Sequence, residues 1–99
     1  MGQDFQEELQ TRIRAIIVRR LDGTTPPRQE ITADTSILGK GLGLDSVEAL
    51  ALVTEIEAEF DIGIDDEELT VDLFRNIGTL AEFVGKKLSR EQRQVKEAR

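Results

Sequence analysis

Apolar residues recur with the period of an α-helix in three parts of the chain. In the first part, Asp4 followed by Glu7 has the form of a capping box, in which two side chains satisfy the N–H groups at a helix start. The apolar positions that follow are separated by four, four, three and one residues: Phe5, Leu9, Ile13, Ile16 and Ile17. We therefore expect a helix from about Asp4 to Leu21.

The clearest helical pattern begins after Asp45. That residue is well placed as an N-cap, and Glu48 stands at the third helical position, where its side chain can complete a capping box. One apolar face follows, made of Ala49, Leu52, Val53, Ile56 and Phe60. The pattern predicts a helix from about Ser46 to Phe60. Val47 falls off this face, so we expect it at the surface beside Ser46.

The chain after residue 60 carries shorter signals. Gly63 and a cluster of acids interrupt the helical period. Three apolar anchors that indicate one short helix come next: Leu69, Leu73 and Phe74. Thr79 can then cap a last helix. The apolar positions of that helix are Leu80, Phe83, Val84 and Leu88.

Two segments lack a sustained period. Residues 22–44 contain adjacent prolines and several glycines, which predicts a long connection between the first two helices, and its scattered Ile and Leu residues predict that it packs onto the core. Residues 89–99 are charged and predict a disordered tail behind a domain formed by residues 1–88. Three longer helices, one short helix and a long first connection describe an all-α fold, a small four-helix bundle.

Composition removes several kinds of chemistry. The chain contains no cysteine and no histidine, so thiolate catalysis, a serine–histidine hydrolase and a histidine-ligated metal site are excluded within it. The acidic segment after residue 60 does not match the ligand register of a calcium loop. The first residues have neither a signal peptide pattern nor an apolar span, so we expect a cytoplasmic protein without membrane insertion.

The net charge of −7 is unevenly distributed. Residues 41–74 carry eleven acids and no Lys or Arg. Such a segment repels nucleic acids and anionic membranes and attracts basic patches on proteins, which makes basic protein partners the natural inference. The alternative is that these acids are solvated helix faces that keep a small protein soluble.

Ser46 is the candidate functional residue, and three roles are open to it. As a nucleophile it lacks a histidine base and the glycine-flanked turn of a nucleophile elbow. As a structural residue it is a common choice for a helix start. Its place in the first helical turn, after a long loop and inside the acidic segment, also makes its hydroxyl accessible to another protein's active site.

The stretch GLGLDSVEAL, residues 41–50, resembles the attachment motif of acyl carrier proteins, with Leu42, Gly43, Asp45 and Ser46 in the matching places. The resemblance extends over EIEAEFDIGIDDEEL and DLFRNIGTLAEFV and covers about residues 4–88. It implies a carrier without catalytic residues or a metal. Ser46 would receive 4′-phosphopantetheine from a phosphopantetheinyl transferase, and acyl-loading and acyl-transferring enzymes with basic docking patches would be the other partners of a monomer.

The sequence also departs from the pattern typical of bacterial fatty-acid carriers. Val47 replaces a leucine, Ala51 stands where an acid is usual, and Lys40 and Gly41 replace acids before the motif. These differences favour a specialised carrier of acyl intermediates in fatty acid, lipid or polyketide biosynthesis. Two alternatives stay open: an aminoacyl or peptidyl carrier of a peptide-synthetase pathway, and a helical interaction module in which Ser46 only starts a helix.

Overall fold

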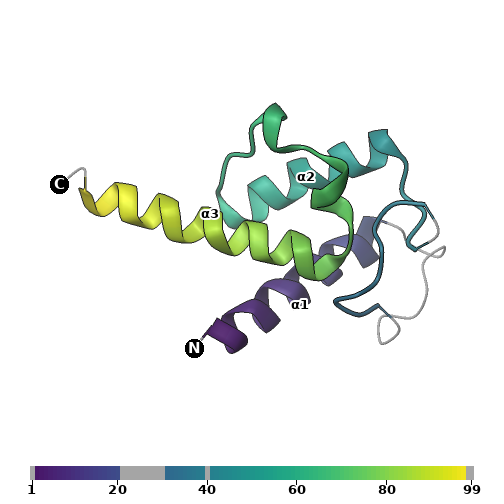
Figure 1. Cartoon of the computed structure of the whole chain (residues 1–99), viewed down its shortest axis with the longest axis horizontal. Helices are drawn as coiled ribbons and strands as arrows, with labels where there is room; N and C mark the ends of the chain where they lie inside the picture. Colours follow the sequence, from purple (N-terminus) through teal and green to yellow (C-terminus); the bar gives the residue numbers. More distant parts are fainter. Residues whose placement is uncertain (1, 21–30, 40, 98–99) are drawn as a thin grey trace.

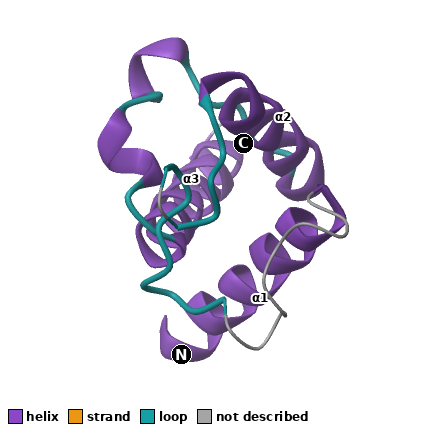
Figure 2. Ribbon diagram, turned by 90° about the vertical axis from the view of Figure 1, so that its right-hand side faces the viewer, coloured by secondary structure: helices purple, strands orange, loops and turns teal. Residues whose placement is uncertain are grey.

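A computed structural model describes residues 2–20, 31–39 and 41–97 of the chain. Within these residues it contains three α-helices and two short 3-10 helices and no extended strand. In chain order they are α1 (Gly2–Arg20), α2 (Ser46–Phe60), η2 (Asp66–Glu68), η3 (Val71–Phe74) and α3 (Ile77–Glu97). Figures 1 and 2 show the α-helices grouped around one interior, with η2 and η3 on the segment that links α2 to α3. The all-α prediction is confirmed.

The helix α1 buries the predicted apolar face but starts earlier than expected. It begins at Gly2, so Asp4 lies inside its first turn rather than at its cap, and Leu21 lies outside the described residues. No proline stands before Asp4, and Gln3 is a good helix former, so the helix extends past the predicted start. Four members of the predicted face are buried, while Phe5 at the outer end stays 40% exposed. The buried members are Leu9, Ile13, Ile16 and Ile17.

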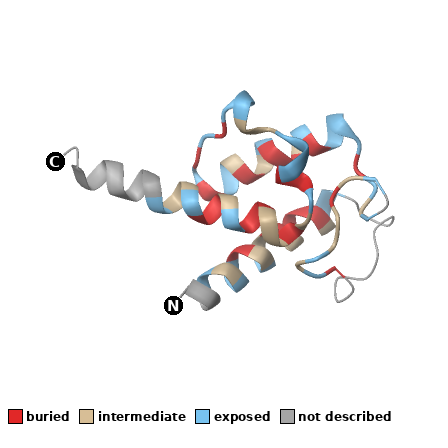
Figure 3. Cartoon of the chain, in the orientation of Figure 1, coloured by how far each residue is buried: buried red, intermediate tan, exposed pale blue. Residues whose placement is uncertain are grey.

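The helix α2 has the predicted bounds and the predicted buried face. All five apolar positions of that face are in the core: Ala49, Leu52, Val53, Ile56 and Phe60. Because these positions recur at three and four residues, they fall on one side of a 3.6-residue helix. Figure 3 shows buried residues on the inward sides of the helices and exposed residues on their outer sides. The core is therefore assembled from the faces that the sequence pattern predicts.

Arginines of α1 pair with acids of α2. Arg12 donates to the carboxylate of Glu59 from Nε at 3.2 Å and from Nη2 at 2.9 Å, and its guanidinium lies 4.4 Å from the centre of the Phe60 ring. Arg20 forms an ion pair with Glu55. Both pairs are partly exposed, so each adds modestly to stability. Their main consequence is that part of the acidic segment is neutralised within the molecule.

The connection before α2 is packed where the structure describes it. Ile31 and Ile37 are buried, and Leu44 is buried just before the helix. Backbone N–H groups at the start of α3 donate back to this connection: Ile77 to Thr35 at 3.2 Å, and Gly78 to Ala33 at 2.9 Å. The prediction of a packed connection is thus confirmed for residues 31–39 and 41–44, and residues 22–30 lie outside the described residues.

The segment after α2 differs in detail from the prediction. The expected short helix is the pair of 3-10 helices, and α3 begins at Ile77, two residues before the predicted cap. Asn76 caps it instead, because its Oδ1 accepts from the Thr79 N–H at 2.8 Å, so the prediction of Thr79 as the cap was wrong. Either side chain can cap a helix, and the packing of Ile77 in the core selects the earlier start.

The helix α3 runs on to Glu97, through most of the segment 89–99 for which the sequence predicts a charged tail. Figure 1 shows its C-terminal part extending beyond the other helices. None of the described helices combines the length and the apolar character that a membrane crossing requires.

Candidate functional site

The first turn of α2 is held by two acids that cap each other. The backbone N–H of Glu48 donates to Asp45 Oδ1 at 2.8 Å, and the backbone N–H of Asp45 donates to Glu48 Oε1 at 3.1 Å. This is the predicted capping box. It fixes the backbone on both sides of Ser46, which is the first residue of the helix and is exposed.

Backbone hydrogen bonds hold the loop that precedes this turn. Leu42 donates its N–H to the Ser36 carbonyl at 2.8 Å, and Leu44 donates to Ile37 at 3.2 Å. Gly41 lies where a Cβ atom would stand 1.9 Å from the Ser36 carbonyl oxygen, so any larger residue there displaces the loop. The loop therefore needs glycine at this position of the GLGLDSVEAL stretch.

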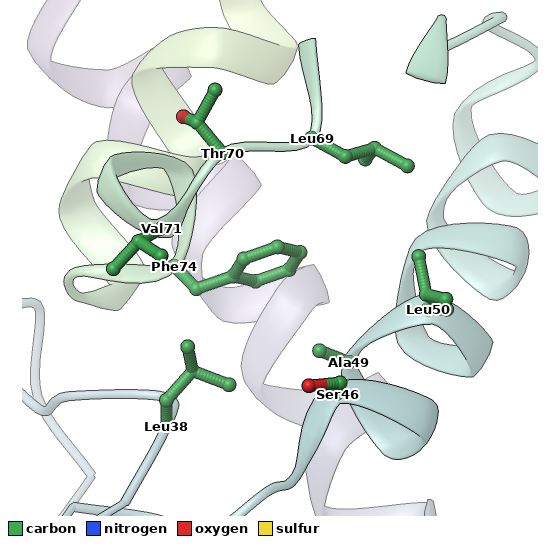
Figure 4. A pocket seen from close by; sticks show the side chains of 8 residues that line it. All are labelled: Leu38, Ser46, Ala49, Leu50, Leu69, Thr70, Val71 and Phe74. Carbon is green, nitrogen blue, oxygen red and sulfur yellow. The ribbon is translucent and has the colours of Figure 1, made fainter. Parts of the chain in front are cut away.

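An apolar recess opens beside Ser46. It has a volume of about 190 Å³. Residues from three parts of the chain line it: Leu38, Ser46, Ala49, Leu50, Leu69, Thr70, Val71 and Phe74. Figure 4 shows Ser46 and Leu38 on one side of the recess, Leu50 on the first turns of α2, and Leu69 to Phe74 on the opposite segment. The surface of the recess is largely hydrocarbon, and the hydroxyls of Ser46 and Thr70 are the polar side-chain groups among its lining residues.

Exposed apolar side chains gather around the same place. Among the described residues four large hydrophobic side chains are exposed, and three of them flank the serine or line the recess. These are Val47, 75% exposed, Leu50, 50% exposed, and Val71, 78% exposed. Val47 thus lies at the surface, as the sequence predicts. Apolar side chains grouped in this way mark a contact surface better than the same residues scattered singly.

Several acids of the predicted acidic segment have partners within the molecule. Glu57 Oε2 accepts from the Ile64 N–H at 2.8 Å, and Asp72 forms an ion pair with Arg75 at 2.8 Å. Apart from Asp45 and Glu48 of the capping box, the remaining exposed acids lie at the C-terminal end of α2 and around η2: Asp61, Asp65, Asp66 and Glu67. No three carboxylates among the described residues come together as a potential metal site. The acidic character is therefore reduced along α2 and retained near η2.

This arrangement can present a hydroxyl but offers it no base. The chain has no histidine. The carboxylates of Asp45 and Glu48, on either side of Ser46 in the sequence, accept backbone N–H groups in the capping box. A serine hydroxyl without a positioned base is a poor nucleophile at neutral pH. Chemistry at Ser46 therefore needs a base supplied by another protein.

The sequence pattern predicts the serine and its cap but not the recess. Leu38, Leu69 and Phe74 stand out in the sequence only as apolar anchors, and Val71 carries no role there. An apolar residue between Thr70 and Asp72 was the available signal for an exposed contact residue. Their convergence on Ser46 depends on how the segment 69–74 folds back over α2, which spacing alone does not specify.

Comparison with known proteins adds independent findings. Residues 11–84 match the family described as the phosphopantetheine attachment site. The mitochondrial acyl carrier protein of Saccharomyces cerevisiae is 33% identical over 70 residues, which cover 69% of this chain and 54% of the yeast protein. The acyl carrier protein of Thermotoga maritima is 26% identical over 83 residues, which cover 84% of this chain and 95% of that protein. The chain thus spans about half the length of the yeast relative.

Proposed function

The chain belongs to the phosphopantetheine attachment site family, and from this we propose that Ser46 bears the 4′-phosphopantetheine arm and that acyl intermediates travel on it as thioesters. The family is one of carriers rather than catalysts, and its prosthetic group is 4′-phosphopantetheine. Membership also implies a phosphopantetheinyl transferase and acyl-processing enzymes as partners in general. The choice of Ser46 is supported by one observation above all: an exposed hydroxyl at the start of α2 beside an apolar recess.

The residues around Ser46 fit such a group. A phosphodiester on this hydroxyl would lie at the N-terminus of α2, where the helix macrodipole favours negative charge, and its oxygens would stay in solvent because Ser46 is exposed. The recess beside it is lined largely by hydrocarbon and can shelter apolar atoms from water. The arm supplies the thiol on which an acyl group is carried, a function that a chain without cysteine cannot perform by itself.

Partner enzymes approach the surface around Ser46. The transferase supplies the base that removes the hydroxyl proton, since the capping acids are engaged with the backbone. The Ser46 oxygen would then bond to the phosphorus that bears the pantetheine of coenzyme A, and adenosine 3′,5′-bisphosphate would leave. Val47, Leu50 and Val71 give these enzymes an apolar contact. Glu48, together with the acids near η2, gives them a negative field that favours enzymes with basic docking patches.

The cargo belongs to fatty acid, lipid or polyketide biosynthesis in this proposal. The yeast and Thermotoga relatives reported above both carry the name acyl carrier protein, which supports an acyl rather than an aminoacyl group. We further propose that residues 1–88 form the carrier domain and that 89–99 are an extension outside it, because the family match ends at residue 84. Val47 and Ala51, which depart from the usual carrier pattern, support a specialised member with few partners.

The modification is tested with purified enzyme. The protein is incubated with coenzyme A, magnesium and a broad-specificity phosphopantetheinyl transferase, and intact mass spectrometry follows the product. One phosphopantetheine mass is expected on the wild type and on Ser89→Ala, which changes another exposed serine, and none on Ser46→Ala. A wild type that stays unmodified with several transferases, or a modified Ser46→Ala variant, contradicts the proposal.

The cargo is tested on protein purified from its native cell. Mass spectrometry of the thioester released by hydroxylamine should identify an acyl hydroxamate. An amino acid hydroxamate would contradict the acyl assignment and would assign the protein to peptide synthesis, with the attachment of the arm unaffected.

A further inference from the structure

The short helix η2 has little apolar contact with the bundle. None of its three residues is buried. Glu68 joins it to α3 through an ion pair with Lys87, in which Oε1 and Nζ are 2.9 Å apart. A segment that lacks buried apolar side chains depends on polar contacts for its position.

The same carboxylate oxygen also closes η2 on itself. Glu68 Oε1 accepts from the Asp65 N–H at 2.8 Å, while the Glu68 N–H donates to the Asp65 carbonyl at 2.9 Å. One atom therefore connects the capping of η2 with α3. Lys87, nineteen positions after Glu68 in the sequence, thus shares this acceptor oxygen with the Asp65 N–H of the η2 cap.

The surroundings of Lys87 strengthen this ion pair. Its side chain is only 12% exposed, compared with 40% for Arg12 in the ion pair with Glu59. Its ammonium lies 5.8 Å from the centre of the Phe83 ring, one helical turn earlier on α3. A charge-assisted contact that is shielded from solvent is screened less by salt than a surface pair.

The residues that follow η2 form the wall of the recess opposite α2. Leu69 and Thr70 come directly after Glu68, and both line the recess beside Ser46. Their N–H groups donate back to η2, from Leu69 to the Asp66 carbonyl at 3.1 Å and from Thr70 to the Glu68 carbonyl at 3.0 Å. Backbone hydrogen bonds therefore connect Leu69 and Thr70 to η2, while the Thr70 carbonyl also accepts from the Leu73 N–H of η3 at 3.0 Å.

We propose that Lys87 is a positioning residue for the recess beside Ser46: its ion pair with Glu68 holds η2 on α3 and thereby fixes the wall formed by Leu69 and Thr70. When the ion pair breaks, the wall moves away from α2 and the recess widens. A cation on a partner enzyme that competes for Glu68 releases the wall in the same way. The importance of this movement for a carried group rests on the proposed function of Ser46, whereas the positioning itself does not.

Amide hydrogen exchange, measured by NMR on the unmodified protein, tests the positioning. Lys87→Met removes the charge and keeps the length of the side chain, and Glu68→Gln keeps an oxygen that can accept from Asp65. In both variants the amides of Leu69 and Thr70 should exchange about tenfold faster than in the wild type. Because no modified protein is used, the result is independent of whether Ser46 carries the arm.

Two further variants separate positioning from general stability. Lys86→Met changes the neighbouring exposed lysine and should leave the exchange of Leu69 unchanged, while Lys87→Arg keeps the charge and should restore most of the protection. Unchanged exchange at Leu69 in Lys87→Met overturns the proposal. Equal acceleration at Leu52 in the core also overturns it, since the ion pair would then support the whole fold.

A thiol probe gives a second measurement. The chain has no cysteine, so a single Leu69→Cys substitution introduces one labelling site in the wall of the recess. Combined with Lys87→Met, this thiol should react with an uncharged alkylating reagent several-fold faster than in the Leu69→Cys background alone. Equal labelling rates in the two proteins would show that the wall keeps its place without Lys87.

Discussion

Asp45 and Glu48 each accept a hydrogen bond from the other's backbone N–H, at 2.8 Å and 3.1 Å, across the turn that begins with Ser46. The two acids therefore serve the fold as well as the surface charge. A substitution at either position can affect stability, recognition or both. The hydrogen-bonding and electrostatic roles can be separated, because an amide side chain keeps the acceptor oxygen and loses the charge.

Asp45→Ala should lower the free energy of unfolding by about 1 kcal/mol, because the Glu48 N–H loses its acceptor at the start of α2. Urea denaturation of the unmodified protein measures the change. Asp45→Asn keeps a capping oxygen and should remain close to the wild type. A similar loss in both variants would assign the effect to charge rather than to the cap.

Glu48→Lys should slow association with the phosphopantetheinyl transferase, because it reverses a charge two residues after Ser46. The decrease should shrink as salt is raised, since exposed charges are screened. Stopped-flow measurements across a salt series provide the rates. Glu48→Gln, which keeps the cap, should give an intermediate rate, and a decrease that does not depend on salt would indicate contact through Val47 instead.

Asp61→Gly should raise the free energy of unfolding by about 1 kcal/mol. Asp61 ends α2 with φ of 56° and ψ of 51°, a left-handed conformation that glycine adopts without steric cost. Its negative charge at the C-terminus of a helix is also unfavourable. Urea denaturation of Asp61→Gly at low and high salt distinguishes the two causes, because a gain that disappears at high salt would assign the whole effect to charge.

Gly41→Ala should destabilise the protein by about 2 kcal/mol, because the new Cβ would stand 1.9 Å from the Ser36 carbonyl oxygen. The displaced loop should also slow the modification of Ser46. Gly63→Ala is the matched control, since a Cβ there meets no atom within 4 Å. Thermal unfolding of the two variants tests the difference, and equal melting temperatures would show that the loop adapts at little cost.

Local patterns determined most of the helical structure. The apolar spacing from Ala49 to Phe60 gave the buried face of α2, and Asp45 with Glu48 gave its start. The sequence did not determine the start of a helix where two neighbouring residues can each act as the N-cap. Thr79 and Asn76 are chemically similar choices, and the burial of Ile77 decided between them. The start of α1 at Gly2 likewise depended on continued helix formation that no cap prevented.

The exposure of Ser46 and the absence of an activating base could also be predicted from the sequence. The first depends on its place in the first helical turn, and the second on a composition without histidine. The distribution of acidic charge over the surface could not be predicted from the sequence. Glu55 and Glu59 pair with arginines of α1, and this pairing depends on which face each helix turns toward the other. The acidic residues are contiguous in the sequence, but in the structure some of them are paired with arginines and others stay exposed near η2.

By itself, the sequence determined where the three long helices lie, apart from their ends, which faces they bury and which hydroxyl is presented, since these follow from contacts between residues three or four positions apart. Only the tertiary structure decided what lies beside that hydroxyl. Leu38, Leu50 and Phe74 meet at the recess because three separate parts of the chain pack together. The Glu68–Lys87 ion pair that we propose fixes the recess wall is likewise a contact between segments that no local periodicity relates.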